Sequence, residues 1–262
     1  MIIDSHQHFW KYHPDSHSWI DESMKAIAKD FSPSDLKPIL DENQVDGCIA
    51  VQVDHLEKDT EFLLECAQSN PFIKGVVGWV DLQASNVNDR LAYFSKNNLF
   101  KGVRHIVQAE PVDFMLGHAF QNGISQLAQY GLTYDILIYP HQLKNAIKLV
   151  EKFPNQSFVL DHIAKPKISD GVSENWKSNI EKLASHKNVY CKLSGMVTET
   201  NNFRWKINDF TPFIDTIVNA FGIDRVMFGS DWPVCLTAAN YNEVLNIITK
   251  YFLHIIKVIL TR

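Results

Sequence analysis

Two histidines follow the first apolar residues of the chain. His6 and His8 stand at the end of residues 1–5, whose apolar opening predicts a buried strand. Because alternate residues of a strand project to the same side, the two imidazoles would point at one place, where they could bind a metal ion or a substrate. An isolated His-x-His pair is more often two ordinary histidines, so the prediction depends on what else reaches that place.

Polar and ionisable side chains also follow the other apolar runs of the chain. The candidates for a shared site are Gln52, Asp54, Trp79, Asp81, Arg104, His105, Asp161, His162, Lys165, Asp231 and Trp232. In a parallel barrel the carboxyl ends of all strands surround one pocket, where these side chains would meet. The opposite ends of the same runs carry residues typical of solvated turns, such as Asp46, Lys101 and Asp224. This difference predicts a functional pocket at the carboxyl ends.

Each candidate has an ordinary structural explanation when it is taken alone. Asp231, which stands before Trp-Pro, could cap a turn, and Lys165 could be a solvated loop residue. His162 could be a core histidine bonded to a backbone carbonyl, and Arg104 could pair with Glu110. Residues with unrelated structural roles would not all stand at the same end of the strands, so a shared site is the favoured interpretation. The remaining histidines are given no role: His13, His17, His55, His118, His141, His186 and His254.

The chemistry that these residue types support is hydrolysis. Two imidazoles and an aspartate can hold a divalent ion that activates a water molecule, provided that one coordination position stays open. Without a metal, an aspartate can deprotonate the water while histidine or arginine polarises a carbonyl group. The sequence has no Gly-x-Ser-x-Gly motif and no cysteine beside a plausible base, which argues against covalent catalysis. Nucleotide cofactors are not predicted, since a Gly-x-Gly-x-x-Gly fingerprint is absent.

Short runs rich in valine and isoleucine alternate with longer stretches of helical periodicity. The predicted strands are residues 1–5, 47–53, 75–80, 102–106, 133–138, 157–160, 189–193 and 225–229. The predicted helices are residues 34–43, 59–70, 87–98, 117–130, 141–153, 174–186 and 210–221. Continuous apolar strands that are each followed by a helix indicate a parallel sheet covered on both faces. Eight such units favour a (β/α)8 TIM barrel in one domain over residues 1–262, with an open doubly wound sheet as the alternative.

Local signals agree with these elements. Ser34 is the predicted N-cap of its helix, while Gly131 and Gly222 follow two helices where a left-handed residue is expected. The connection at residues 9–31 is long for a loop between a strand and a helix, and long loops are often functional. It contains Trp10, Tyr12, His17 and Trp19, of which Trp19 is a candidate for substrate binding.

The composition excludes several classes of protein. A formal net charge of -5 without a cluster of basic residues argues against binding to nucleic acid. The four cysteines are widely spaced and predict reduced, packed thiols. The N-terminus does not resemble a secretory signal, and the apolar residues 251–260 are fewer than the roughly 20 that a membrane span needs. We therefore expect a cytoplasmic protein that is not inserted in a membrane.

Five motifs in register resemble one family. They are His6-Gln7-His8-Phe9-Trp10, Gly102-Val103-Arg104-His105, Leu160-Asp161-His162 with Lys165-Pro166, Lys192-Leu193-Ser194-Gly195, and Phe228-Gly229-Ser230-Asp231-Trp232-Pro233. From about residue 1 to about residue 245 the chain is similar to the sugar-lactonase branch of the amidohydrolase superfamily, which includes L-fuconolactonases and L-rhamnonolactonases. The resemblance implies a (β/α)8 barrel that hydrolyses a sugar lactone, a small molecule, to the sugar acid.

The resemblance also implies roles for individual residues. The predicted catalytic residues are Asp231, as general base on water, with His162, His105 and Arg104, which would orient and polarise the lactone. The predicted substrate-binding residues are Gln52, Lys165, Trp79, Trp232 and Trp19. His6 and His8, together with Asp231, would bind one divalent ion such as zinc, or the two histidines would contact the carbonyl region of the substrate without a metal. The predicted fifth strand, residues 133–138, lacks the lysine or histidine that the superfamily often adds.

Two alternatives follow from the same residues. One is a metal-dependent decarboxylase or amide hydrolase on the same barrel. The other is a binding protein that has lost activity, because residues 251–262 depart from the terminal helix usual in the family. A truncated or frame-shifted end, or a contact in a homo-oligomer, would explain that departure.

Overall fold

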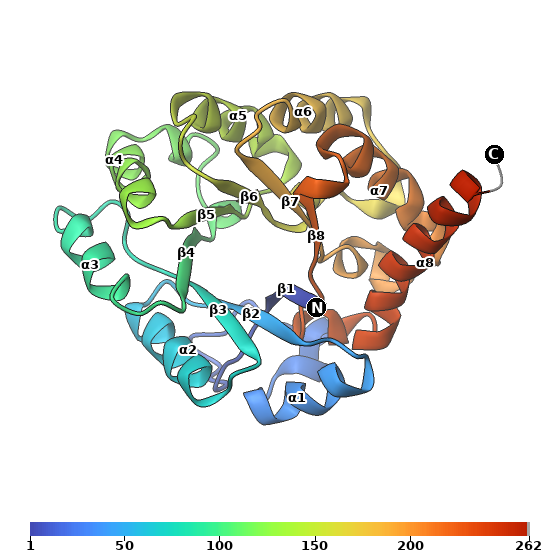
Figure 1. Ribbon diagram of the computed structural model, residues 1–262, viewed down its shortest axis with the longest axis horizontal. Coiled ribbons are helices and arrows are strands. Elements are labelled where there is room, and N and C mark those ends of the chain that lie inside the picture. The colour runs from blue at the N-terminus through green and yellow to red at the C-terminus, as the bar shows by residue number, and fades with distance from the viewer. Residues whose placement is uncertain (261–262) are drawn as a thin grey trace.

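Eight parallel strands form one sheet in the order of the chain, as seen in a computed structural model that describes the backbone of residues 1–260 and the side chains of residues 1–253. The strands are β1 (Ile3–Gln7), β2 (Gly47–Val51), β3 (Ile73–Gly78), β4 (Phe100–His105), β5 (Thr133–Ile136), β6 (Phe158–Leu160), β7 (Val189–Leu193) and β8 (Val226–Phe228). The helices are α1 (Pro33–Glu42), α2 (Glu57–Ser69), α3 (Val87–Phe94), α4 (His118–Leu127), α5 (Leu143–Lys152), α6 (Glu174–Ala184), α7 (Ile207–Phe221) and α8 (Tyr241–Leu260). Figure 1 shows the helices as a ring around the strands, which confirms the predicted (β/α)8 barrel.

The segment after β8 closes the barrel against β1. Gln7 pairs with Trp232 in a parallel bridge, and the N–H of His8 donates to the carbonyl oxygen of Trp232 at 2.7 Å. The N–H of Asp231 donates to the carbonyl oxygen of His6 at 2.8 Å, while the N–H of Ser230 donates to Asp4 Oδ1 at 2.9 Å. These bonds exclude the open sheet and place Asp231 directly beside the two histidines of β1.

The helix α8 is missing from the predicted helices, and most of the other differences between predicted and observed elements lie at element ends. The N-cap of α1 is Ser32 rather than the predicted Ser34, since Asp35 accepts from the Ser32 N–H at 2.8 Å in a capping box. Gly131 adopts the predicted left-handed conformation, with φ 65° and ψ 24°. Gly222 also has a positive φ, 75°, but its ψ of 161° is extended, so the left-handed prediction is wrong there.

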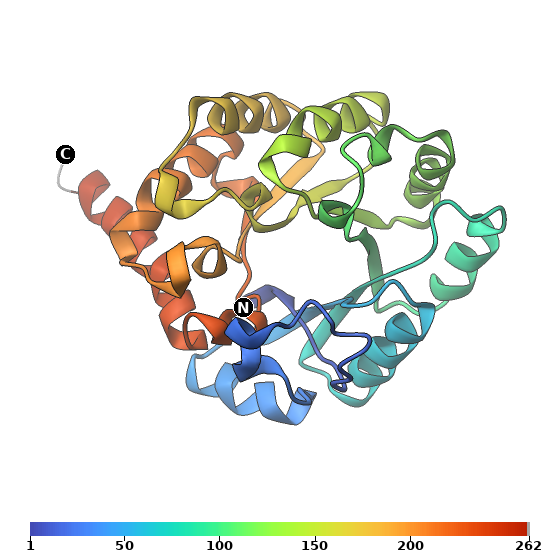
Figure 2. The same cartoon turned by 180° about the vertical axis from the view of Figure 1, so that it is seen from behind.

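The long loop after β1 lies over the barrel on the face seen in Figure 2. Trp10 and Phe31 form an antiparallel bridge that ties its two ends together, and the indole N–H of Trp10 donates to the carbonyl oxygen of Lys29 at 2.8 Å. The chain between them contains the short 3-10 helix Glu22–Ile27. The aromatic residues of this loop are therefore held next to the carboxyl end of β1.

The last helix, α8, runs beside α7 toward the C-terminus (Figure 1). It is 20 residues long and includes residues 251–260, which the sequence analysis treated as an unusual segment. The departure predicted for the terminal helix concerns residues 251–262. The side chains of residues 254–262 are outside the described part of the chain. Of the helices that the structure describes, none is both long and apolar enough to cross a bilayer.

Candidate active site

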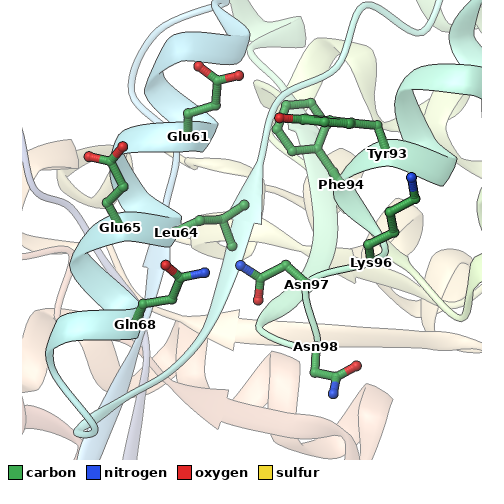
Figure 3. A pocket seen from close by; sticks show the side chains of 9 residues that line it. All are labelled: Glu61, Leu64, Glu65, Gln68, Tyr93, Phe94, Lys96, Asn97 and Asn98. Carbon is green, nitrogen blue, oxygen red and sulfur yellow. The ribbon is translucent and has the colours of Figure 1, made fainter.

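The structure contains a surface hollow and a buried polar cluster, and they lie in different places. The hollow, of about 640 Å³, lies between α2 and α3 on the outer ring, where Glu61 and Glu65 face Tyr93 and Phe94 (Figure 3). No member of the three histidine and carboxylate groups that could hold a metal ion lines it. Those groups lie at the carboxyl ends of the strands, so the chemistry belongs to that end of the barrel.

The central cluster joins two histidines of β1 to the segment after β8. Nε2 of His6 lies 3.2 Å from Nε2 of His8, and Oδ1 of Asp231 lies 3.3 Å from Nε2 of His8 and 3.8 Å from Nε2 of His6. His162, from the segment after β6, brings its Nε2 to 3.9 Å from the same Asp231 oxygen. All four side chains are buried, so Asp231 is surrounded by three imidazoles.

Other groups fix the orientation of these rings. Nδ1 of His8 lies 2.8 Å from the carbonyl oxygen of Val51, which assigns the proton to Nδ1 and turns the Nε2 lone pair toward Asp231. Nδ1 of His162 lies 2.8 Å from the hydroxyl of Ser194. Gly195 allows this ring to come close, because a Cβ there would lie 2.5 Å from His162 Nδ1 and the residue has φ 63°. The carbonyl of Val51, the hydroxyl of Ser194 and the space left by Gly195 thus hold the rings in one arrangement.

Burial and charge set the protonation states of the cluster. Burial raises the pKa of the Asp231 carboxyl, but the charge that His162 can carry and the contact with His8 outweigh burial, so the pKa lies below its ordinary value. Burial lowers the pKa of His162 to about 4 despite the opposing charge of Asp231, and burial also lowers the pKa of His6 well below its ordinary value. An ionised carboxylate beside neutral imidazoles is the arrangement that a general base needs near neutral pH.

We expect His162 to titrate near pH 4 in protein treated with a chelator. Because burial disfavours the imidazolium, its folded pKa lies below the unfolded value, and the folded protein loses stability as the pH falls from 6.5 toward 4. NMR of the histidine C2 protons over this range measures the pKa directly, and the spectrum of His162→Gln assigns the signal. A midpoint near 6.5 would contradict this account of the site.

A network of buried charges lies beneath the cluster, and the sequence analysis missed most of it. Lys192 of β7 forms an ion pair with Asp135 of β5 and a second one, at 3.0 Å, with Asp161. Arg104 of β4 pairs with Asp161 at 3.3 Å and not with Glu110, the partner that its ordinary structural explanation would give it. All four side chains are at most 4% exposed. The sequence places Asp161 at a strand end, among the candidates for the site. Asp135 and Lys192 could have been found because each is a charged residue within an otherwise apolar strand.

This network contacts His6 on both sides of its ring. Nζ of Lys192 lies 3.2 Å from Nδ1, which also lies 3.4 Å from Oδ1 of Asp161. Nη1 of Arg104 lies 3.3 Å from Nε2 of the same ring. Since Arg104 and Lys192 are buried against opposite sides of the His6 ring, they fix its position.

The predicted residues His105, the last residue of β4, and Trp79, which directly follows β3, contact each other beside the cluster. The indole N–H of Trp79 donates to Nδ1 of His105 at 3.3 Å, and Nε2 of His105 lies 2.9 Å from Oε1 of Glu110. Both nitrogens of His105 therefore have protein partners. Nε2 of Gln52 donates to the carbonyl oxygen of Arg104 at 3.1 Å, which ties β2 to β4 at the same level.

The structure separates the remaining candidates. Lys165 lies in the segment after β6, with its Nζ 3.3 Å from Oε1 of Glu199. Trp19 keeps 40% of its surface exposed next to Trp10, whereas Trp232 is 1% exposed and packs edge-on against aromatic rings of the core. The geometry thus gives Trp19 free surface for a ligand and gives Trp232 a packing contact.

The residues His6, His8 and Asp231 fit a single metal ion. Four donors held tetrahedrally at the usual zinc distances of about 2.0–2.2 Å would lie roughly 3.3–3.6 Å apart, and the three donor atoms here are separated by 3.2, 3.3 and 3.8 Å. The lone pair of His8 faces the Asp231 carboxylate, a repulsive arrangement that a cation or a shared proton relieves. The bond from His8 to Val51 is the type of contact that orients a metal-binding histidine.

Comparison with known proteins identifies the family. The family model described as amidohydrolase matches residues 3–250. The chain belongs to the amidohydrolase family. Among its relatives, an L-fucono-1,5-lactonase of Burkholderia multivorans is 35% identical over 96% of this chain and 88% of its own length.

Solved amidohydrolase structures agree with this assignment. One from Burkholderia multivorans, with bound zinc, has a TM-score of 0.92 and 35% identity, covering 96% of this chain and 91% of its own. A dihydroxybenzoic acid decarboxylase from a Polaromonas species shares the fold at a TM-score of 0.62 and 14% identity, covering 94% of this chain and 89% of its own. The decarboxylase is the more distant of these two amidohydrolase-like barrels.

Proposed function

We propose that this chain hydrolyses a sugar-acid lactone of the L-fucono-1,5-lactone type to the aldonic acid. The observation that carries the proposal is the buried Asp231 carboxylate, kept ionised among three imidazoles at the carboxyl end of the barrel. The 35% identity to an L-fucono-1,5-lactonase over most of both chains supports a lactone as the substrate class.

In this proposal Asp231 accepts a proton from the attacking water. Its lowered pKa keeps the carboxylate ionised over the whole neutral range, and its position among His6, His8 and His162 places the water next to groups that polarise the lactone carbonyl. Arg104, held against His6, adds positive charge where the oxyanion forms. The proton on Asp231 can then pass to the ring oxygen that leaves.

The same residues would hold a metal ion if one is required. His6, His8 and Asp231 are the ligands whose geometry fits, and the bound zinc in the solved Burkholderia multivorans relative supports zinc as the metal. Such an ion would supply a Lewis acid for the carbonyl and lower the pKa of a bound water. Without a metal Asp231 acts on the water as a base, and with one it would serve as a ligand of the ion.

Proton release from a panel of lactones tests the proposed function. Purified protein, with and without a chelator, is given five- and six-membered sugar lactones in weakly buffered solution, and we expect turnover of at least one. An aromatic acid that could lose carbon dioxide serves as the alternative substrate. Failure to open any lactone, in a protein shown to be folded by circular dichroism, would refute the proposal, and release of carbon dioxide would favour a decarboxylase.

A further inference from the structure

The loop after β2 carries two adjacent polar side chains that lie outside the cluster around Asp231. Asp54 and His55 are both half-buried. Within residues 1–253, no group donates a hydrogen bond to the Asp54 carboxylate, and none accepts one from Nδ1 of His55. The Asp54 carboxylate, an acceptor, and the His55 Nδ1–H, a donor, are therefore neighbours that can each form a hydrogen bond with a ligand.

The backbone around these residues is fixed by bonds to neighbouring segments. Oδ2 of Asp59 accepts from the N–H of Val53 at 2.8 Å and from the N–H of Asp54 at 3.3 Å. Nε2 of His55 accepts from the N–H of Ile106 at 2.9 Å, so the proton of the neutral ring sits on Nδ1. Burial and the charge of His105 lower the pKa of His55 to about 4, which keeps Nδ1–H a neutral donor.

His55 is part of a stack of flat rings along the ends of β3 and β4. Its ring centroid lies 5.7 Å from that of Trp79 and 4.0 Å from that of His105, with interplanar angles of 19° and 26°. His105 stacks in turn on Phe114 at 4.8 Å. Since both nitrogens of His105 have protein partners, Nδ1 of His55 is the imidazole donor that this stack leaves for a ligand.

A second group of aromatic rings comes from the loop after β1. The ring of His17 stacks on Tyr12 at 5.7 Å and lies 5.8 Å from Trp10, whose own ring is 6.5 Å from that of His8. Nε2 of His17 is buried and has no hydrogen-bond partner among the described atoms. Burial raises the pKa of Asp54, and the charge that His17 can carry opposes that shift.

We propose that Asp54 and His55 form a subsite that binds hydroxyl groups of the substrate ring. The carboxylate accepts from one or two hydroxyls and Nδ1 of His55 donates to another, while the ring of Trp79, stacked on His55, lies beside them. A carboxylate at this place repels an anionic aromatic acid and favours a neutral polyhydroxylated ring. The inference rests on the proposed lactone hydrolysis and names the groups that select its substrate.

The subsite is placed to hold the part of the substrate away from the reacting carbonyl. Val51, whose carbonyl oxygen lies 2.8 Å from Nδ1 of His8, precedes Asp54 by three residues on the same strand end. Three residues of chain span at most about 10–11 Å, so a ring bound beside His8 lies within that distance of Asp54.

The test compares two six-membered lactones, L-fucono-1,5-lactone and δ-valerolactone, which has no ring hydroxyls. The ratio of kcat/KM for the sugar lactone to kcat/KM for δ-valerolactone should fall about 10- to 100-fold in Asp54→Asn, because a hydrogen bond to a charged group is lost. His55→Phe, which keeps a flat ring in the stack, should lower the same ratio about tenfold. Asp113→Asn, the same change at an exposed residue of the loop after β4, should leave the ratio within twofold.

Calorimetry with 1,5-anhydro-L-fucitol, which has the hydroxylated ring but no lactone, makes the two proposals separable. Wild type should bind this polyol, and Asp54→Asn should bind it at least tenfold more weakly. If wild type opens no lactone but shows this difference in binding, the proposed function fails and the subsite stands. Equal losses on both lactones in Asp54→Asn and in His55→Phe, or no binding of the polyol by wild type, would overturn the subsite.

Discussion

Asp231→Asn should lower kcat/KM for the preferred lactone by about 10²- to 10⁴-fold, the usual contribution of general-base catalysis. The amide keeps the shape of the carboxylate but cannot take a proton from water. Asp231 has a left-handed φ of 57°, which asparagine tolerates better than most residues, so the backbone turn should persist. Steady-state kinetics by proton release, together with circular dichroism of both proteins, measures the effect.

The chelator arm of the same experiment separates the two roles of Asp231. If wild-type turnover survives removal of metal, Asp231 acts as a base without an ion, and the zinc content of wild type and Asp231→Asn should be equally low. If turnover is lost to the chelator and restored by zinc, His6, His8 and Asp231 act as ligands, and Asp231→Asn should purify with less zinc. Asp113→Asn, an exposed aspartate, is the matched control. A folded Asp231→Asn that keeps more than a tenth of wild-type kcat/KM would contradict both roles.

The overall barrel and the central cluster could be predicted because each depends on patterns local in the chain. Eight apolar runs such as residues 189–193 were found, seven of them followed by a helical stretch, so the number of strands and their parallel direction could be predicted. His6, His8, His162 and Asp231 all stand at strand ends, and a closed parallel sheet brings such ends together. Those four side chains do meet, because Oδ1 of Asp231 lies 3.3, 3.8 and 3.9 Å from Nε2 of His8, His6 and His162.

The parts that could not be predicted depend on which way a side chain points inside the barrel. Lys192 and Asp135 lie within apolar strands, and their sequence alone does not say that both face the axis and pair there. Trp232 stands next to Asp231 and was expected to bind substrate, yet the turn after β8 directs its ring into the core against Phe31. His55 gave no signal because its ring is placed by Trp79 and His105, which are distant in the chain.

The buried charge network should respond to mutation in a way that an apolar core would not. Lys192→Met should lower the free energy of unfolding by about 3–5 kcal/mol, because it leaves the buried carboxylates of Asp135 and Asp161 with Arg104 as their remaining cation. Methionine nearly matches the lysine in volume, so the cost reflects charge rather than a cavity. Chemical denaturation followed by intrinsic fluorescence measures the change.

The double variant Lys192→Met with Asp135→Asn decides whether charge is the cause. Removing Asp135 as well restores the balance, since Asp161 keeps its pair with Arg104, and the double variant should regain at least about 2 kcal/mol relative to Lys192→Met alone. Lys182→Met, which removes an exposed lysine 3.4 Å from Glu151, is the matched control and should change stability by less than about 1 kcal/mol. Additive losses in the double variant would mean that Lys192 stabilises the barrel through packing. Coupling of the expected sign would mean that the charges of Lys192, Asp135, Asp161 and Arg104 neutralise one another beneath His6. The His6 imidazole would then keep one position and one protonation state while Asp231 gains and loses a proton.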